Sequence, residues 1–175
     1  MSTRKLVLAA LVLASGTGAA LADGPNGGKS ISEADIKPWN IDVLPDGTNM
    51  PPGSGTAKQG EAIYSQKCAM CHGEKGQNPR PGYVPLVGSH TFPKIDSPKT
   101  VTYYEFATTL FDFIRRSMPF QQPKTLTDDE VYALSAYILS INKLIGENDV
   151  MNKDTLPKVK MPNAGKFIIP YPDRI

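Results

Sequence analysis

Three stretches of the chain carry apolar and small residues at the spacing of an α-helix. The first follows Thr56, which makes a T-x-x-Q capping pattern with Gln59 and predicts a helix beginning there. Gly60, Tyr64 and Cys68 lie four residues apart, so they share one face of this helix. A glycine inside a helix costs about 1 kcal/mol relative to alanine, and a second helix crossing closely at Gly60 would explain it.

The second stretch predicts a helix that begins at Thr102, where Glu105 completes a T-x-x-E capping pattern. This helix must end near Pro119, because a proline moves the residue before it out of helical geometry. The apolar residues that recur at helical spacing along it are Phe106, Leu110, Phe113 and Ile114.

The third stretch repeats the same capping pattern at Thr127 and Glu130 and predicts a last helix from there. Its buried stripe consists of Val131, Leu134, Ile138 and Ile141, with Tyr137 beside it. The three helices predict a mostly α domain over residues 56–141. Residues 23–55 and 142–175 lack a helical period, so we expect an extended N-terminal arm and an extended C-terminal tail.

The first 22 residues have the order of a secretory signal peptide. Arg4 and Lys5 precede nine apolar residues, Leu6 to Ala14, and Ala22 ends a small-x-small cleavage site. Nine residues are too few to cross roughly 30 Å of hydrocarbon as a helix, and no later stretch is apolar enough to span a membrane. We therefore expect cleavage after Ala22 and a soluble protein in the periplasm.

Charge argues against a nucleic-acid partner. The predicted cleavage removes two basic residues and no acidic one, so Lys plus Arg falls from 19 to 17 against 17 Asp plus Glu. A protein that binds nucleic acid usually presents a basic surface, whereas the mature chain is close to neutral.

Cys68 and Cys71 are the only cysteines in the chain, and His72 follows them directly, as C-x-x-C-H. A redox dithiol is one interpretation, but it normally sits in a βαβ unit, and strands are scarce here. Half of a zinc site is a second, but no further cysteine pair exists and His90 is the only other histidine. Covalent haem attachment is the third and is favoured, because the added histidine is its signature.

Haem attachment accounts for each residue of the motif. The two thiols on one turn of chain each add to a haem vinyl group, and His72 is held under the iron as proximal ligand. The other ring nitrogen of such a histidine needs an acceptor, often a backbone carbonyl. We expect Pro85 to supply it and Leu86 to pack on the haem ring. His90 is a less favoured candidate for the sixth ligand, since a lone loop histidine is usually exposed.

Met118 is the predicted distal ligand. Met118 lies 46 residues after His72, and Pro119 forces it into extended geometry at a helix end. A thioether in that position can reach the open face of the haem. The other methionines of the mature chain lie in the attachment motif, the arm or the tail: Met50, Met70, Met151 and Met161. Histidine and methionine together raise the reduction potential and close both axial positions, which suits electron transfer.

Gly60 and Tyr64 before the C-x-x-C-H motif, Met118 in the distal loop and Tyr137 in the last helix resemble a class I cytochrome c over residues 56–141. The resemblance implies three main helices around one haem c. It also implies a haem edge near solvent, framed by Ala69, Met70, Pro119 and Phe120. Arg115 and Arg116 are then expected to steer a partner or hold a haem propionate, unless they are merely solvated.

Longer sequence segments resemble the cytochrome subunits of bacterial sulfite dehydrogenases and related sulfur-oxidation complexes: "LPDGTNMPPGSGTAKQGEAIY", "ATTLFDFIRRSMPF", "LTDDEVYALSAYILSIN" and "MPNAGKF". This resemblance implies a mono-haem electron carrier rather than an enzyme. It would accept single electrons from the catalytic subunit of a molybdenum sulfite dehydrogenase and pass them to a downstream cytochrome c or terminal oxidase. The alternative is a haem enzyme, a peroxidase or sulfur-compound oxidase, in which substrate displaces Met118.

Overall fold

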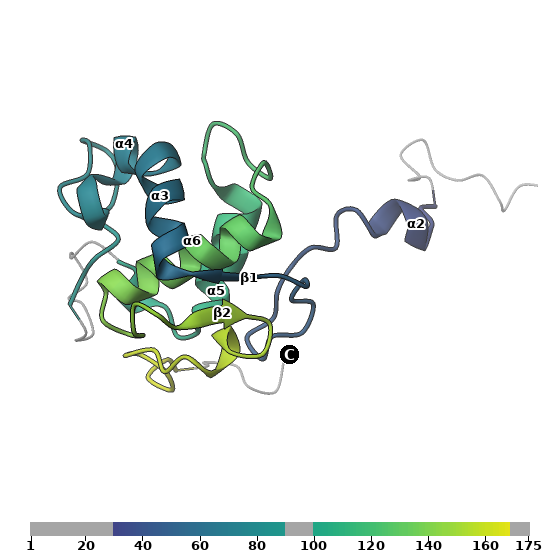
Figure 1. Cartoon of the computed structure of the whole chain (residues 1–175). Helices are drawn as coiled ribbons and strands as arrows, with labels where there is room; N and C mark the ends of the chain where they lie inside the picture. Colours follow the sequence, from purple (N-terminus) through teal and green to yellow (C-terminus); the bar gives the residue numbers. More distant parts are fainter. Residues whose placement is uncertain (1–29, 90–99, 169–175) are drawn as a thin grey trace, which may run out of the picture. The chain divides into compact units, whose positions relative to one another are not determined.

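The computed structural model describes residues 30–89 and 100–168 (Figure 1). The predicted signal peptide, residues 1–22, and His90 lie outside the described residues. The chain divides into two units, residues 1–39 and 40–175. In the described part of the first unit, Ser32 caps one short helix, α2 (Glu33–Ile36), and none of its residues is buried.

The second unit is mainly helical. Its α-helices are α3 (Ala57–Lys67), α4 (Ala69–His72), α5 (Ala107–Ser117) and α6 (Asp128–Ile141). Short 3-10 turns cover η1 (Glu74–Gly76), η2 (Val101–Tyr103) and η3 (Leu156–Lys158). Two strands, β1 (Ser54–Thr56) and β2 (Val150–Asn152), pair antiparallel with Gly55 opposite Met151. No described helix combines the length and the apolar character that crossing a membrane requires.

Two of the three predicted helix starts are confirmed. Thr56 and Gln59 form a full capping box at α3, and Thr127 and Glu130 form one at α6. In each, the threonine hydroxyl accepts the backbone N–H three residues on, and the Gln or Glu side chain accepts the N–H of the cap residue.

The predicted start at Thr102 is wrong, because α5 begins at Ala107. The Thr102 hydroxyl donates to the Ser89 carbonyl at 2.6 Å. The Glu105 carboxylate accepts the backbone N–H of Gly165 at 3.0 Å. Both side chains that would have formed a capping box are therefore bonded to distant segments. The predicted helix end is confirmed, since α5 stops at Ser117 and Met118 is extended (φ −116°, ψ 147°).

α3 and α6 cross closely at Gly60, as its position predicted. A Cβ atom on Gly60 would lie 1.9 Å from the carbonyl oxygen of Ala133 and 2.7 Å from Cβ of Tyr137, so only glycine fits. Tyr64 stacks at the same crossing, its ring centroid 5.1 Å from that of Tyr137. Every residue from 131 to 139 is buried, which makes α6 the centre of the core.

The segments on either side of the helices pack onto them. In the segment before α3, Pro51 accepts a hydrogen bond from the buried Tyr132 hydroxyl at 2.8 Å. In the segment after α6, Met151, Leu156 and Met161 are buried in the core. Asn163 donates to the Thr102 carbonyl at 3.0 Å. Residues before α3 and after α6 therefore contribute to the packed core, and the bounds of the arm, the domain and the tail stay predictions.

Candidate functional site

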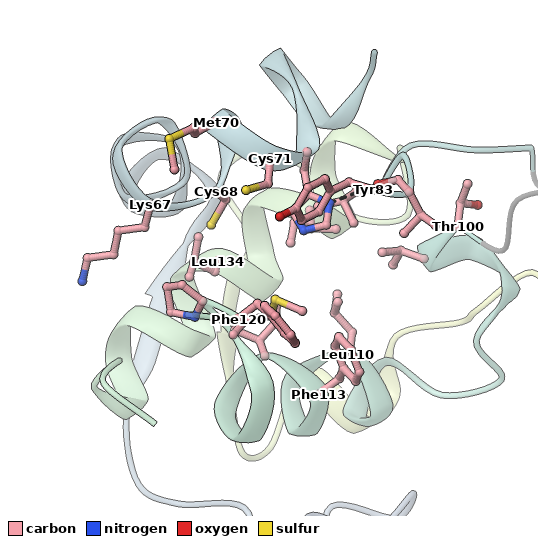
Figure 2. Close-up of a pocket in the computed structure, with 18 of the residues that line it drawn as sticks. Lys67, Cys68, Met70, Cys71, Tyr83, Thr100, Leu110, Phe113, Phe120 and Leu134 are labelled. Atoms are coloured by element: carbon pink, nitrogen blue, oxygen red, sulfur yellow. Dashed lines mark hydrogen bonds between the residues drawn. The ribbon is translucent and has the colours of Figure 1, made fainter. Parts of the chain in front are cut away.

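A cavity of about 600 Å³ lies between the C-x-x-C-H segment and helices α5 and α6. Its lining is largely apolar, with Leu110, Phe113 and Ile114 from α5 and Leu134 and Ile138 from α6. Figure 2 shows Cys68 and Cys71 on one side of this space and Leu110, Phe113 and Phe120 across from them. A volume of this size is in the range of cofactor sites, roughly 300–1,000 Å³.

The two cysteines enter the cavity because α3 ends and α4 begins at Cys68. The backbone N–H of Cys71 bonds to the Cys68 carbonyl at 3.1 Å, which makes one tight turn. Both thiols then point into the cavity (Figure 2), while Met70 between them also lines the cavity but is 66% exposed. The spacing of two residues between the cysteines thus directs both thiols to one ligand.

A glycine ends the turn. Gly73 has a φ of +77°, and a Cβ atom there would lie 1.7 Å from the Gln77 carbonyl oxygen, so the chain can only turn away from His72 at a glycine. The Tyr64 hydroxyl donates to the Gly73 carbonyl at 3.0 Å. Tyr64 therefore ties the attachment segment to the α3–α6 crossing.

The Cys68 thiol has the wrong acidity for redox chemistry. Burial raises the pKa of Cys68 to about 11, whereas reactive dithiols of C-x-x-C motifs have a lowered thiol pKa. A buried thiol held in its neutral form over an apolar cavity does not attack disulfides readily. The redox-dithiol interpretation is therefore disfavoured by the surroundings of Cys68 as well as by the helical fold.

His72 is oriented by a carbonyl one residue away from the expected one. Nδ1 of His72 lies 3.0 Å from the carbonyl oxygen of Val84, not from that of Pro85. The loop is turned here by Gly76, whose carbonyl accepts the N–H of Leu86 at 2.9 Å, and this turn brings the Val84 carbonyl to the ring. Because a carbonyl only accepts, Nδ1 donates and Nε2 keeps a lone pair for a metal. Leu86 lines the cavity.

Met118 also lines the cavity, from the C-terminal end of α5. It directly follows α5, which also carries Phe113, whereas the cysteines come from the segment at the end of α3. Met151 and Met161 are buried in the core instead, and neither lines the cavity. Two thiols, an oriented imidazole and a thioether around one apolar space fit a covalently attached haem.

The two arginines expected near a haem propionate do not line the cavity. Arg115 pairs with Asp128, Nε to Oδ1 at 2.8 Å, and Arg116 pairs with Asp112 one helical turn before it. Both guanidinium groups are thus held by carboxylates outside the lining of the cavity. That either arginine holds a propionate or steers a partner stays a prediction.

Several polar residues of the lining were missed by sequence reasoning, among them Tyr83, Thr100 and Tyr104. Tyr83 meets the His72 ring edge to face, with centroids 6.1 Å apart. Burial raises the pKa of Tyr104, so its hydroxyl stays protonated. No local pattern distinguishes these three residues, because loops and a 3-10 turn carry them to the cavity.

Comparison with known proteins connects this geometry to described families. Residues 55–138 match the family model described as "Cytochrome C oxidase, cbb3-type, subunit III". A chain of the crystal structure of the sulfane dehydrogenase SoxCD from Paracoccus pantotrophus is 34% identical, with a TM-score of 0.72. That match covers 84% of this chain and 71% of the other.

Two curated relatives are named thiosulfate dehydrogenase. The protein from Stutzerimonas stutzeri is 31% identical over 51% of this chain and 29% of its own length. The protein from Psychrobacter arcticus is 27% identical over 63% of this chain and 36% of its own length. The chain thus spans about a third of the length of these curated relatives.

Proposed function

Because the chain belongs to the cytochrome c family, we propose that it holds one haem c and carries single electrons in the periplasm. The observation that carries this proposal is the cavity lined by Cys68, Cys71, His72 and Met118. The fold is that of a class I cytochrome c, in which α3, α5 and α6 surround the cofactor site. A haem c in this site supplies a one-electron iron couple.

Each side chain has a separate part in holding the cofactor. Cys68 and Cys71 would provide the two thioethers, and their apolar surroundings exclude water from the attachment. His72 would bind through Nε2, since its Nδ1 donates to Val84. Met118 would bind from the other side, and a methionine opposite a histidine raises the reduction potential. With both axial positions filled by the protein, no position is left for substrate.

The proposed partner is an enzyme that oxidises a sulfur compound. The relatives named above are a sulfane dehydrogenase and thiosulfate dehydrogenases. We favour the catalytic subunit of a molybdenum sulfite dehydrogenase as donor, and a downstream cytochrome c or terminal oxidase as acceptor. An apolar rim around the cavity is suited to brief docking, because it exposes the side chains of Met70, Tyr83, Val84, Phe113 and Phe120.

Phe120 is the most exposed member of this apolar rim, at 75%, and its loss should slow electron delivery. We expect Phe120→Ser to lower, several-fold, the rate at which the sulfite dehydrogenase subunit reduces the haem in the presence of sulfite. Stopped-flow mixing measures this rate, and the haem spectrum should stay unchanged. Transient electron-transfer contacts are small, under about 1,200 Å², so one exposed aromatic ring is a large share of the contact.

The matched control is Phe106→Ser. Phe106 is also exposed but lies at the other end of α5 and does not line the cavity. This variant should be reduced as fast as the wild type. Equal rates for the two serine variants would remove the apolar rim from the docking site.

A second function is favoured by the names of the curated relatives: thiosulfate oxidation at the haem itself, with Met118 displaced. Adding thiosulfate and a small-molecule one-electron acceptor, ferricyanide, to the ferric protein in the absence of any second protein distinguishes the two. An electron carrier keeps its low-spin spectrum and does not turn over thiosulfate. Sustained thiosulfate turnover by the chain alone would establish the enzyme instead.

A further inference from the structure

The loop that carries Met118 has few contacts of its own with the core. It connects the end of α5 at Ser117 to the start of α6 at Asp128. All six residues from 120 to 125 are exposed. Within the loop, the Gln122 N–H donates to the Pro119 carbonyl at 2.8 Å and the Thr125 hydroxyl donates to the Gln122 carbonyl at 2.8 Å. Only Met118 and Leu126, near its two ends, pack against the core. The position of the loop is therefore decided mainly at its base.

Arg115 and Asp128 close that base. Arg115 lies three residues before Met118, and Asp128 is the first residue of α6. Their ion pair measures 2.8 Å from Nε to Oδ1, and the arginine side chain is only 19% exposed. Charge-assisted bonds are stronger than neutral ones, and partial burial reduces the screening by water. The pair thus joins the two ends of the loop through side chains.

Arg115 is also anchored to a third segment. Its Nη1 donates to the carbonyl oxygen of Ile41 at 2.9 Å. That segment is fixed again at Val43, whose backbone N–H donates to the buried Asp112 carboxylate at 2.9 Å. Asp112 in turn pairs with Arg116. The guanidinium therefore bridges two fixed acceptors, so Arg115 has little freedom to shift.

We infer that Arg115 is a positioning residue for Met118: by joining the base of the loop it holds the thioether over the cavity. This rests on the proposed function, in which Met118 is an axial ligand. It differs from the role expected from the sequence, since Arg115 acts on the methionine side of the site without touching the cavity. Without the Arg115–Asp128 pair, the loop swings away from the cavity more often.

The experiment uses the full haem-loaded chain in its ferric form, titrated with imidazole. Imidazole binds the iron only when Met118 has left, so its apparent affinity reports the fraction of open loop. Arg115→Gln and Asp128→Ala are each expected to raise this affinity about tenfold, equivalent to about 1.4 kcal/mol. A purely structural role would lower stability without moving the affinity.

Asp129→Ala is the matched control. Asp129 lies in the same first turn of α6 and also accepts a hydrogen bond, from the Ser54 N–H at 2.8 Å, but it does not bond to Arg115. We expect its imidazole affinity to equal that of the wild type. If Asp128→Ala and Asp129→Ala give the same affinity, the inference is overturned. If Arg115→Gln fails to retain haem, the imidazole affinities of Asp128→Ala and Asp129→Ala still test the inference.

A failure of the proposed function is visible separately. The wild-type ferric spectrum, recorded before imidazole is added, must show methionine ligation. A wild type without it refutes Met118 as ligand and with it the role of Arg115. A wild type with it, and equal affinities in all variants, refutes the role of Arg115 alone.

Discussion

Cys71→Ser is expected to lose most of the covalently bound haem. The Cys71 thiol points into the cavity beside that of Cys68 (Figure 2), and a serine hydroxyl does not form the thioether. One thioether remains at Cys68, which weakens retention both during assembly and under denaturation. Haem staining of denaturing gels, at equal protein load, measures the change.

Met70→Ser controls for the disturbance of the segment. Met70 lies between the two cysteines, but it is 66% exposed and cannot form a thioether to haem, so this variant should keep wild-type haem staining. If Cys71→Ser stains as strongly as Met70→Ser, covalent attachment at this motif is wrong.

Met118→Ala should abolish the weak charge-transfer band of methionine bound to ferric haem and lower the reduction potential. The methyl group of alanine cannot reach across the cavity, so the iron loses its thioether and gains water or no ligand. The choice of axial ligands sets the reduction potential of haem proteins over a range of roughly 0.8 V. We expect the potential to fall by a substantial part of that range. Optical spectra and a redox titration measure both effects.

Met70→Ala is the matched methionine control, since Met70 lies within the attachment segment itself and its side chain is 66% exposed. It should keep both the band and the potential. A Met118→Ala protein with an unchanged band would transfer the role of ligand to another side chain.

Local signals in the sequence predicted local structure well. The capping boxes at Thr56 and Thr127 are each built from residues three apart, so no distant partner is needed to form them. Gly60 predicted the helix crossing because a close neighbour explains a mid-helix glycine, although simple tolerance on the surface was the alternative. The C-x-x-C-H spacing predicted the turn at Cys68 for the same reason, since five consecutive positions contain the whole signal.

Predictions that depended on distant partners were less accurate. The pattern at Thr102 and Glu105 looks like a capping box, but Ser89 and Gly165 take those side chains. The acceptor for His72 was misplaced by one residue, from Val84 to Pro85, because the register of that loop is set by Gly76. Such competition between local and tertiary hydrogen bonds leaves no trace in a short sequence window.

The arginines show the same limit. Arg115 and Arg116 precede Met118, which suggested a place at the cavity, yet neighbouring residues of a helix point in different directions, so Arg115 does not share the face of Ile114, which lines the cavity. Asp112 and Asp128 are the partners that hold them there. Neither pairing could be chosen from sequence alone among 17 acidic residues.

The intact mass of the exported protein under denaturing conditions tests the central claim most directly. The account predicts the mass of the polypeptide plus one haem, retained after unfolding and located by proteolysis on the peptide that contains Cys68 and Cys71. A polypeptide mass without haem, with the two cysteines recovered as free thiols or as a disulfide, would contradict it.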